Sequence, residues 1–159
     1  MPVVLVHGNP ETADIWADLA PLLDADAVIA LSPPGFGAPV PDGFGATAAE
    51  YGAWLAGELQ RIEGPIDLVG HDWGAGHVMG LVNVAPGLVR SWASDIAGAL
   101  DPDYVWHDLA QVWQTPEVGE AAVAEMVTSP LEARAAIFLA NGARPELATR
   151  LAAGITPEM

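Results

Sequence analysis

Short apolar runs alternate with segments of helical periodicity over the first 94 residues of the chain. The runs have the length of buried strands and are bounded by glycine, proline or polar residues. Between the later runs, segments 47–62 and 73–85 carry apolar residues at three- and four-residue spacing. The strands are expected at 3–6, 27–31, 66–69 and 89–94. This alternation predicts an α/β fold, a parallel sheet with helices on both faces.

The first two connections between these strands differ in character. Thr12 precedes an apolar stripe at helical spacing and predicts a capped helix between the first two strands. The stripe consists of Ile15, Trp16, Leu19, Leu22 and Leu23. Residues 32–46 are too rich in proline and glycine for regular structure and predict a long loop. Thr47 and Glu50 then have the spacing of a capping box, which predicts the start of the next helix.

Beyond Pro102 the pattern changes to helices alone. These are expected at 103–114, 117–128, 130–140 and 145–153, separated by prolines. Short helices over the carboxyl edge of a parallel sheet would form an α-helical lid that excludes water from a pocket. We therefore divide the chain into a core part, residues 1–100, and a lid or cap segment, residues 101–159.

Composition places the chain among globular proteins of the cytoplasm. Although 52% of the residues are hydrophobic, no apolar run approaches the roughly 20 residues that a membrane span needs. Met1 and Pro2 lead directly into the first strand without a basic region or a cleavage site, so no secretory signal is expected.

Charge and residue usage exclude several functions. With 21 acidic and five basic residues, the net charge of -16 repels nucleic acids and anionic membranes. The absence of cysteine and lysine excludes thiolate and Schiff-base chemistry, so catalysis would use Asp, Glu, Ser or His. Neither a metal-ligand cluster nor a phosphate-binding glycine loop is present in the sequence, and we expect no cofactor.

A motif that carries chemistry stands between the third strand and the helix that follows it. Residues 70–74, Gly-His-Asp-Trp-Gly, have the form and the context of a G-x-nucleophile-x-G elbow. Such a turn would hold the Asp72 carboxylate above the strand ends, near a helix N-terminus that favours its ionised form. The alternative is that Asp72 only caps the helix.

Together with the His-Gly-Asn-Pro segment at residues 7–10, this elbow resembles the Asp-nucleophile α/β-hydrolases, which include haloalkane dehalogenases and epoxide hydrolases. The resemblance covers residues 2–100 and, more loosely, the lid. It implies an α/β-hydrolase fold in which Asp72 attacks a saturated carbon or an epoxide. The product would be an alkyl ester that water then hydrolyses.

The resemblance also assigns roles beside Asp72. The backbone N–H groups of Asn9 and Trp73 match the oxyanion hole of the family. Their side chains match the pair that binds the departing halide in many haloalkane dehalogenases, which makes small haloalkanes the leading substrate class. Asn9 could instead serve only to turn its loop.

Three further residues have two interpretations each. Tyr104 matches a lid tyrosine that protonates an epoxide oxygen, or it packs in the core. Trp106 lines the substrate pocket or belongs to the core of the lid. Asp95, at the end of the fourth strand, is the candidate acid of the catalytic triad, or it caps a helix or serves as a hinge of the lid. It stands one residue early, which would turn its side chain to the opposite face of an ideal strand.

The chain departs from the family pattern in its general base. The family's histidine follows a last strand that we do not find here, so we expect a C-terminally incomplete fold in which Asp72 forms an ester that is not hydrolysed. His7, His71 and His77 do not match that position, and His107 in the lid is a remote substitute. A non-catalytic hydrolase-like module that binds a ligand is therefore a third interpretation. The expected partners are a small apolar substrate and water, and a homodimer stays open.

Overall fold

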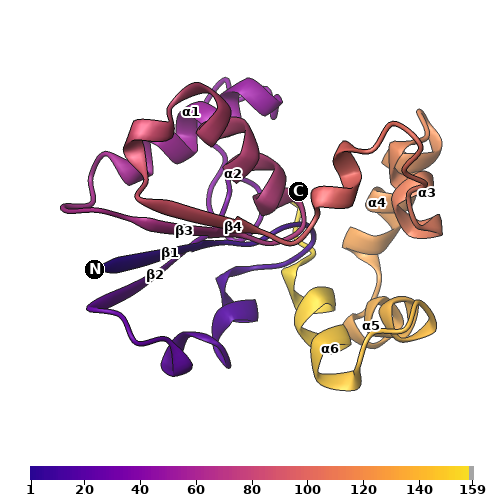
Figure 1. Cartoon of the computed structure of the whole chain (residues 1–159). Coiled ribbons are helices and arrows are strands. Elements are labelled where there is room, and N and C mark those ends of the chain that lie inside the picture. The colour runs from indigo at the N-terminus through magenta and orange to yellow at the C-terminus, as the bar shows by residue number, and fades with distance from the viewer. Residues whose placement is uncertain (158–159) are drawn as a thin grey trace.

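The computed structural model describes residues 1–157, in which four parallel strands form one sheet (Figure 1). The strands are β1 (Pro2–Val6), β2 (Ala27–Leu31), β3 (Asp67–Gly70) and β4 (Ser91–Ser94), in the order β2-β1-β3-β4. All four predicted strands are confirmed, with ends shifted by one or two residues. Val6 pairs with Leu31 on one side and with Gly70 on the other, so three carboxyl ends lie level at one edge.

The sheet is doubly wound. From β1 the chain moves outward to β2, then crosses back over β1 to β3 and continues to β4. The direction of winding therefore reverses between β1 and β3, and the loops that leave these two strands diverge. Ligand sites of open α/β sheets lie in the crevice that such a reversal opens at the carboxyl edge.

One face of the sheet is covered by α1 (Ala48–Leu59) and α2 (Trp73–Val84), which pack on each other as well (Figure 1). The predicted capping box starts α1: the Thr47 hydroxyl accepts the Glu50 N–H, and the Glu50 carboxylate accepts the Thr47 N–H. Apolar side chains of both helices and the central strands form the main core. Its buried members are Val4, Val6, Leu55, Leu59, Ile66, Leu68, Val78 and Leu81.

The prediction of a helix after Thr12 is wrong. The connection between β1 and β2, on the other face of the sheet, contains only two short 3-10 turns, η1 (Ala13–Trp16) and η2 (Ala20–Leu22). Pro21 explains the break, because it has no N–H to donate and its ring clashes with the carbonyl one turn earlier. Thr12 does cap η1, and Trp16 is buried, but Leu22 is 80% exposed.

The predicted lid segment is helical. It contains α3 (Asp108–Gln114), α4 (Val118–Thr128), α5 (Leu131–Ala140) and α6 (Pro145–Gly154). The first helix starts five residues later than predicted: residues 101–103 form a bend and a turn, residues 104–107 have no regular structure, and His107 caps α3. These helices share a small core of their own, made by Met126, Phe138, Ala148, Ala152 and Ile155. Further short turns are η3 (Pro86–Leu88) and η4 (Ala97–Leu100).

The helical segment lies at the carboxyl edge of the sheet (Figure 1). Its last helix contacts the loop after β1 so closely that a Cβ on Gly154 would stand 2.2 Å from the Pro10 carbonyl oxygen. Because two backbone segments are in direct contact there, α6 packs tightly against the loop after β1. Within residues 1–157, no helix combines the length and the apolar character that crossing a membrane requires.

The core predicts a sharp contrast between two leucines. Leu55 is fully buried between α1 and the sheet, so Leu55→Ala should lower the free energy of unfolding by about 2–5 kcal/mol. The matched control Leu22→Ala, at an exposed position, should change it by less than about 0.5 kcal/mol. Urea denaturation followed by circular dichroism measures both, and equal losses would contradict the assignment of the core.

Candidate active site at the carboxyl edge

Asp72 occupies a strained turn between β3 and α2. Its backbone angles are φ 50° and ψ -128°, in a region that residues with a side chain rarely adopt. Asp72 holds the N-cap position of α2, but its carboxylate makes no capping hydrogen bond to the helix. The side chain therefore does not cap the helix, and the alternative that Asp72 only serves as a helix cap is wrong.

Two glycines make the elbow turn, residues 70–74, sterically feasible. A Cβ on Gly70 would stand 2.5 Å from the Ala75 Cα, and one on Gly74 would stand 2.3 Å from the Val6 carbonyl oxygen. Real side chains do not approach backbone atoms this closely. The start of α2 thus lies directly against the end of β1, as the spacing of the glycines predicts.

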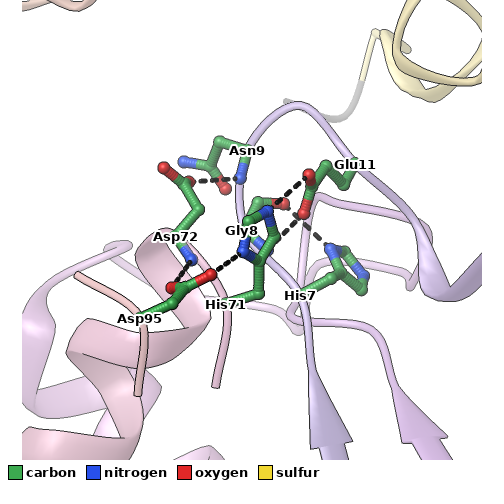
Figure 2. Close-up of polar contacts among 7 residues, drawn as sticks. All are labelled: His7, Gly8, Asn9, Glu11, His71, Asp72 and Asp95. Atoms are coloured by element: carbon green, nitrogen blue, oxygen red, sulfur yellow. Dashed lines mark hydrogen bonds and ion pairs between the residues drawn. The ribbon is translucent and has the colours of Figure 1, made fainter. Parts of the chain in front are cut away.

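The loop after β1 lies on the other side of Asp72 (Figure 2). A Cβ on Gly8 would collide with the Asp72 carboxylate, and the Asn9 N–H donates a hydrogen bond to Asp72 Oδ1 at 3.1 Å. The Trp73 N–H has no acceptor among residues 1–157, as expected for the first residue of a helix. One backbone donor is thus bound to the carboxylate, and the next residue along the chain from Asp72 carries a second donor without an acceptor among the described residues.

A row of charged side chains runs behind the elbow turn. The Glu11 carboxylate is 7% exposed; its Oε2 accepts the Gly8 N–H at 2.9 Å, and its Oε1 lies 3.2 Å from His71 Nε2. His71 Nδ1 contacts Asp95 Oδ2 on its other side. Asp95 Oδ1 accepts the Asp72 N–H at 3.2 Å, which closes the row onto the turn.

The predicted orientation of Asp95 is wrong for a simple reason. Strand β4 ends at Ser94, so Asp95 lies in the loop beyond it and the alternation of an ideal strand no longer applies. Its side chain turns toward the elbow and reaches both His71 and the Asp72 backbone (Figure 2).

Three histidines near the site have distinct environments. The hydrogen bond to Glu11, reinforced by Asp95 and opposed by burial, raises the pKa of His71 to about 9, so this imidazole is charged at neutral pH. Burial lowers the pKa of His7, whose Nδ1–H donates to the Gly8 carbonyl while Nε2 meets the Ser32 hydroxyl. Burial also lowers the pKa of His77 to about 4, and its ring stacks on Tyr51.

Two adjoining cavities meet at Asp72. One, of about 530 Å³, lies between Asn9 and the lid helices. The other, of about 740 Å³, lies over α2 and β4 and includes Tyr104. Trp73 and Trp106 line both, and their rings are parallel within 11° with centroids 6.1 Å apart. This aromatic pair forms an apolar wall between the two spaces.

The structure thus brings Asn9, Trp73 and Asp95 around Asp72, while Tyr104 lies apart in the larger cavity against the edge of Trp106. Trp106 lines both cavities. The catalytic or binding roles of all these predicted site residues stay predictions. Sequence reasoning missed Glu11, because an acid one residue after the His-Gly-Asn-Pro segment carries no signal of burial.

His107 is also closer to the site than its sequence position indicated. It lines both cavities, and its Nδ1 accepts the Ala110 N–H at the start of α3. Its placement depends on how the lid folds, which no local motif encodes. Within the described part of the chain, no group of three His, Asp or Glu residues has a geometry that could hold a metal ion.

Comparison with known proteins places this geometry in a family. The profile of the alpha/beta hydrolase family matches residues 3–157, and the chain therefore belongs to the alpha/beta hydrolase family. This confirms the α/β-hydrolase fold that the motifs predicted. No curated protein sequence gives a significant match.

Similar solved structures come from proteins of diverse activity. The bottromycin epimerase BotH is 26% identical with a TM-score of 0.69 over 99% of this chain and 60% of its own. The juvenile hormone epoxide hydrolase of the silkworm Bombyx mori is 22% identical with a TM-score of 0.67, over 98% of this chain and 42% of its own. The naproxen esterase of Bacillus subtilis is 19% identical with a TM-score of 0.62, over 97% and 52%. The chain spans about half of these relatives.

The elbow glycines provide a matched pair of substitutions. Gly74→Ala forces a Cβ into the Val6 carbonyl and should destabilise the fold by roughly 1–3 kcal/mol. Gly76→Ala, on the same helix but with no atom within 4 Å of the added carbon, should stabilise it by about 0.5–1 kcal/mol. Urea denaturation of both variants tests the close contact, and a neutral Gly74→Ala would refute it.

Proposed function

We propose that the chain provides the nucleophile half of a hydrolase that forms an alkyl ester on Asp72, with small haloalkanes as its leading substrate class. The observation that carries the proposal is the Asp72 carboxylate on a strained turn, facing two cavities and bound at Oδ1 by the Asn9 N–H. Strained backbone conformations cluster at active sites, and helix capping does not account for this one.

The first step is a displacement at carbon. Asp72 Oδ2 accepts no hydrogen bond from the described residues and has its lone pairs available. It attacks the carbon that bears the halogen, the new O–C bond forms, and the C–X bond breaks with its electron pair on the departing halide. The product is a neutral ester at Asp72 and a halide ion.

The second step is hydrolysis of that ester. Water adds to the Asp72 carboxyl carbon and gives up a proton to a base, and negative charge develops on Oδ1. The Asn9 N–H already donates to this oxygen, and the Trp73 N–H, on the next residue, has no acceptor among the described residues and would be the second donor. Collapse of this intermediate breaks the bond between the carboxyl carbon and the alkyl oxygen and gives the Asp72 carboxylic acid and an alkoxide. The alkoxide takes up the proton of that acid and leaves as an alcohol, which restores the carboxylate, and the base passes its proton to solvent.

The side chains of Asn9 and Trp73 favour a halide as the leaving group. Both line the 530 Å³ cavity together with Asp72, so an amide N–H and an indole N–H are within one space with the nucleophile. Such donors match a small anion that leaves a carbon centre. The mostly apolar lid residues of the same cavity suit an alkyl chain.

The described histidines provide no evident base for the second step. His71 is an imidazolium at neutral pH and has no lone pair to accept a proton. Both ring nitrogens of His7 are engaged, His77 lies outside the two cavities, and Nδ1 of His107 is held by a backbone N–H. Asp95 as the triad acid stays a prediction, since its contacts are to His71 and the Asp72 backbone. We therefore expect the ester to accumulate on this chain.

Epoxide hydrolysis is the second candidate. It is favoured by Tyr104, which lines the larger cavity that Asp72 also lines and whose hydroxyl could protonate an epoxide oxygen, and by the fold shared with the silkworm epoxide hydrolase. A third candidate, a binding module without catalysis, is supported by the lack of a free histidine base among the described residues and by a fold that does not by itself fix function. It predicts ligand affinity that survives Asp72→Ala.

Intact mass spectrometry after incubation with a short 1-haloalkane should show one alkyl group per chain, and peptide mapping should locate it on Asp72. Asp72→Asn should show none, whereas Asp42→Asn, on an exposed loop, should react like the unchanged chain. The same ester on a different acidic residue, or many turnovers by this chain alone, would contradict the proposal. Ligand binding without any adduct would support the binding module.

Two substitutions separate the substrate classes. An alkyl halide adds only its alkyl group, whereas an epoxide adds its entire mass, so the adduct itself identifies the reaction. Asn9→Ala keeps the backbone N–H but removes the amide, and should slow ester formation from the haloalkane about 10- to 100-fold. Tyr104→Phe should slow only the reaction with the epoxide. Reaction with epoxides alone would replace the leading candidate with the second.

A further inference from the structure

An unbroken row of polar contacts joins the two loops that flank Asp72 (Figure 2). It begins at the Gly8 N–H, passes through Glu11 and His71 to Asp95, and ends at the Asp72 N–H. The first residues belong to the loop after β1, the middle one to the elbow turn, and Asp95 to the loop after β4. Three strand ends are thereby connected through one imidazole ring.

The contacts require a particular protonation state of that ring. Each nitrogen of His71 faces a carboxylate oxygen, Glu11 at Nε2 and Asp95 at Nδ1. A neutral imidazole has only one N–H and would present a lone pair to one of the two carboxylates. Only the doubly protonated ring donates to both, so the geometry by itself specifies a cation.

We propose that Glu11 and His71 are positioning residues, in which the buried Glu11 carboxylate fixes the His71 cation and this ion pair holds the loop of Asn9 against the elbow turn of Asp72. The effect on ester formation rests on the proposed function, whereas the link between the two loops does not. Neither side chain needs to touch the substrate.

Charge explains why the cation matters. The charged groups that face His71 are Glu11 after β1 and Asp95 after β4, with His7 nearby and His107 lining the same cavity. Two carboxylates thus share one positive charge. Loss of that charge would leave the two carboxylates to repel each other, and the loops that carry them would separate from the elbow turn.

The link has a defined pH range. Since Glu11 and Asp95 raise the pKa of His71 to about 9, the cation is fully present below the ordinary histidine range and is lost as the pH rises through about 9. The hydrogen bond from the Asn9 N–H to Asp72 connects the same two segments that this cation links, the loop after β1 and the elbow turn. Its chemical shift should therefore report the same titration.

Nuclear magnetic resonance of the chain labelled with ¹⁵N tests this directly. The His71 ring should titrate near pH 9, and the backbone amides of Asn9 and Asp72 should shift with the same midpoint. Glu11→Gln should lower that midpoint by more than one pH unit. Glu58→Gln, a control on α1 whose partner is Arg61, should leave it unchanged. If Glu11→Gln does not fold, Asp95→Asn at the exposed end of the row makes the same test.

A His71 midpoint near 6.5, or Asn9 and Asp72 amides that ignore the titration, would overturn the inference. The kinetic arm follows Asp72 ester formation with a 1-haloalkane against pH. The rate should fall at least tenfold as the pH rises through the His71 midpoint, and Glu11→Gln should move this fall to lower pH while haloalkane affinity stays the same. If no ester forms at any pH but the amides follow His71, the proposed function fails and the positioning role stands.

Discussion

The close contact between the start of α2 and the end of β1 is the constraint on which the site depends. Because Gly74 lies against the Val6 carbonyl, the chain has only the elbow turn in which to pass from strand to helix. Asp72 accepts an unfavourable backbone conformation as a result, and its carboxylate projects beyond the strand ends. The same contact brings the Asn9 N–H to that carboxylate. The position of the carboxylate and the hydrogen bond that it accepts from Asn9 thus have one steric origin.

The topology of the sheet explains why other groups gather there. Winding reverses between β1 and β3, so the loops after both strands open at the carboxyl edge, and the loop after β4 lies beside them. Each contributes one member of the charged row: Glu11, His71 and Asp95. The helical segment from α3 to α6 then turns an open edge into two cavities with a shared wall of Trp73 and Trp106. The fold is common to many chemistries, so the function of this chain has to be argued from the groups at this site, the acid on the turn above all.

Features with a local physical cause could be predicted from the sequence. The capping box of Thr47 and Glu50 satisfies its own backbone groups, and the elbow glycines are required by contacts within a strand-turn-helix unit. The prediction of a helix after Thr12 was wrong because it followed the apolar stripe and gave too little weight to Pro21, which has no N–H for a helical hydrogen bond. The positions of the Glu11, Asp95 and His107 side chains depend on how loops that are distant in the sequence pack together. No spacing along the chain reveals that Glu11 is buried against the histidine beside Asp72.

The central claim is that Asp72, and no other acid, forms a bond with the substrate carbon. Carbon-13 magnetic resonance of the chain labelled at the aspartate carboxyl carbons observes this atom itself. On addition of a small haloalkane, the account predicts that one carboxylate signal, the one missing from Asp72→Asn, moves to the position of an ester. If every aspartate signal keeps its carboxylate position, or a different one moves, Asp72 is not the nucleophile.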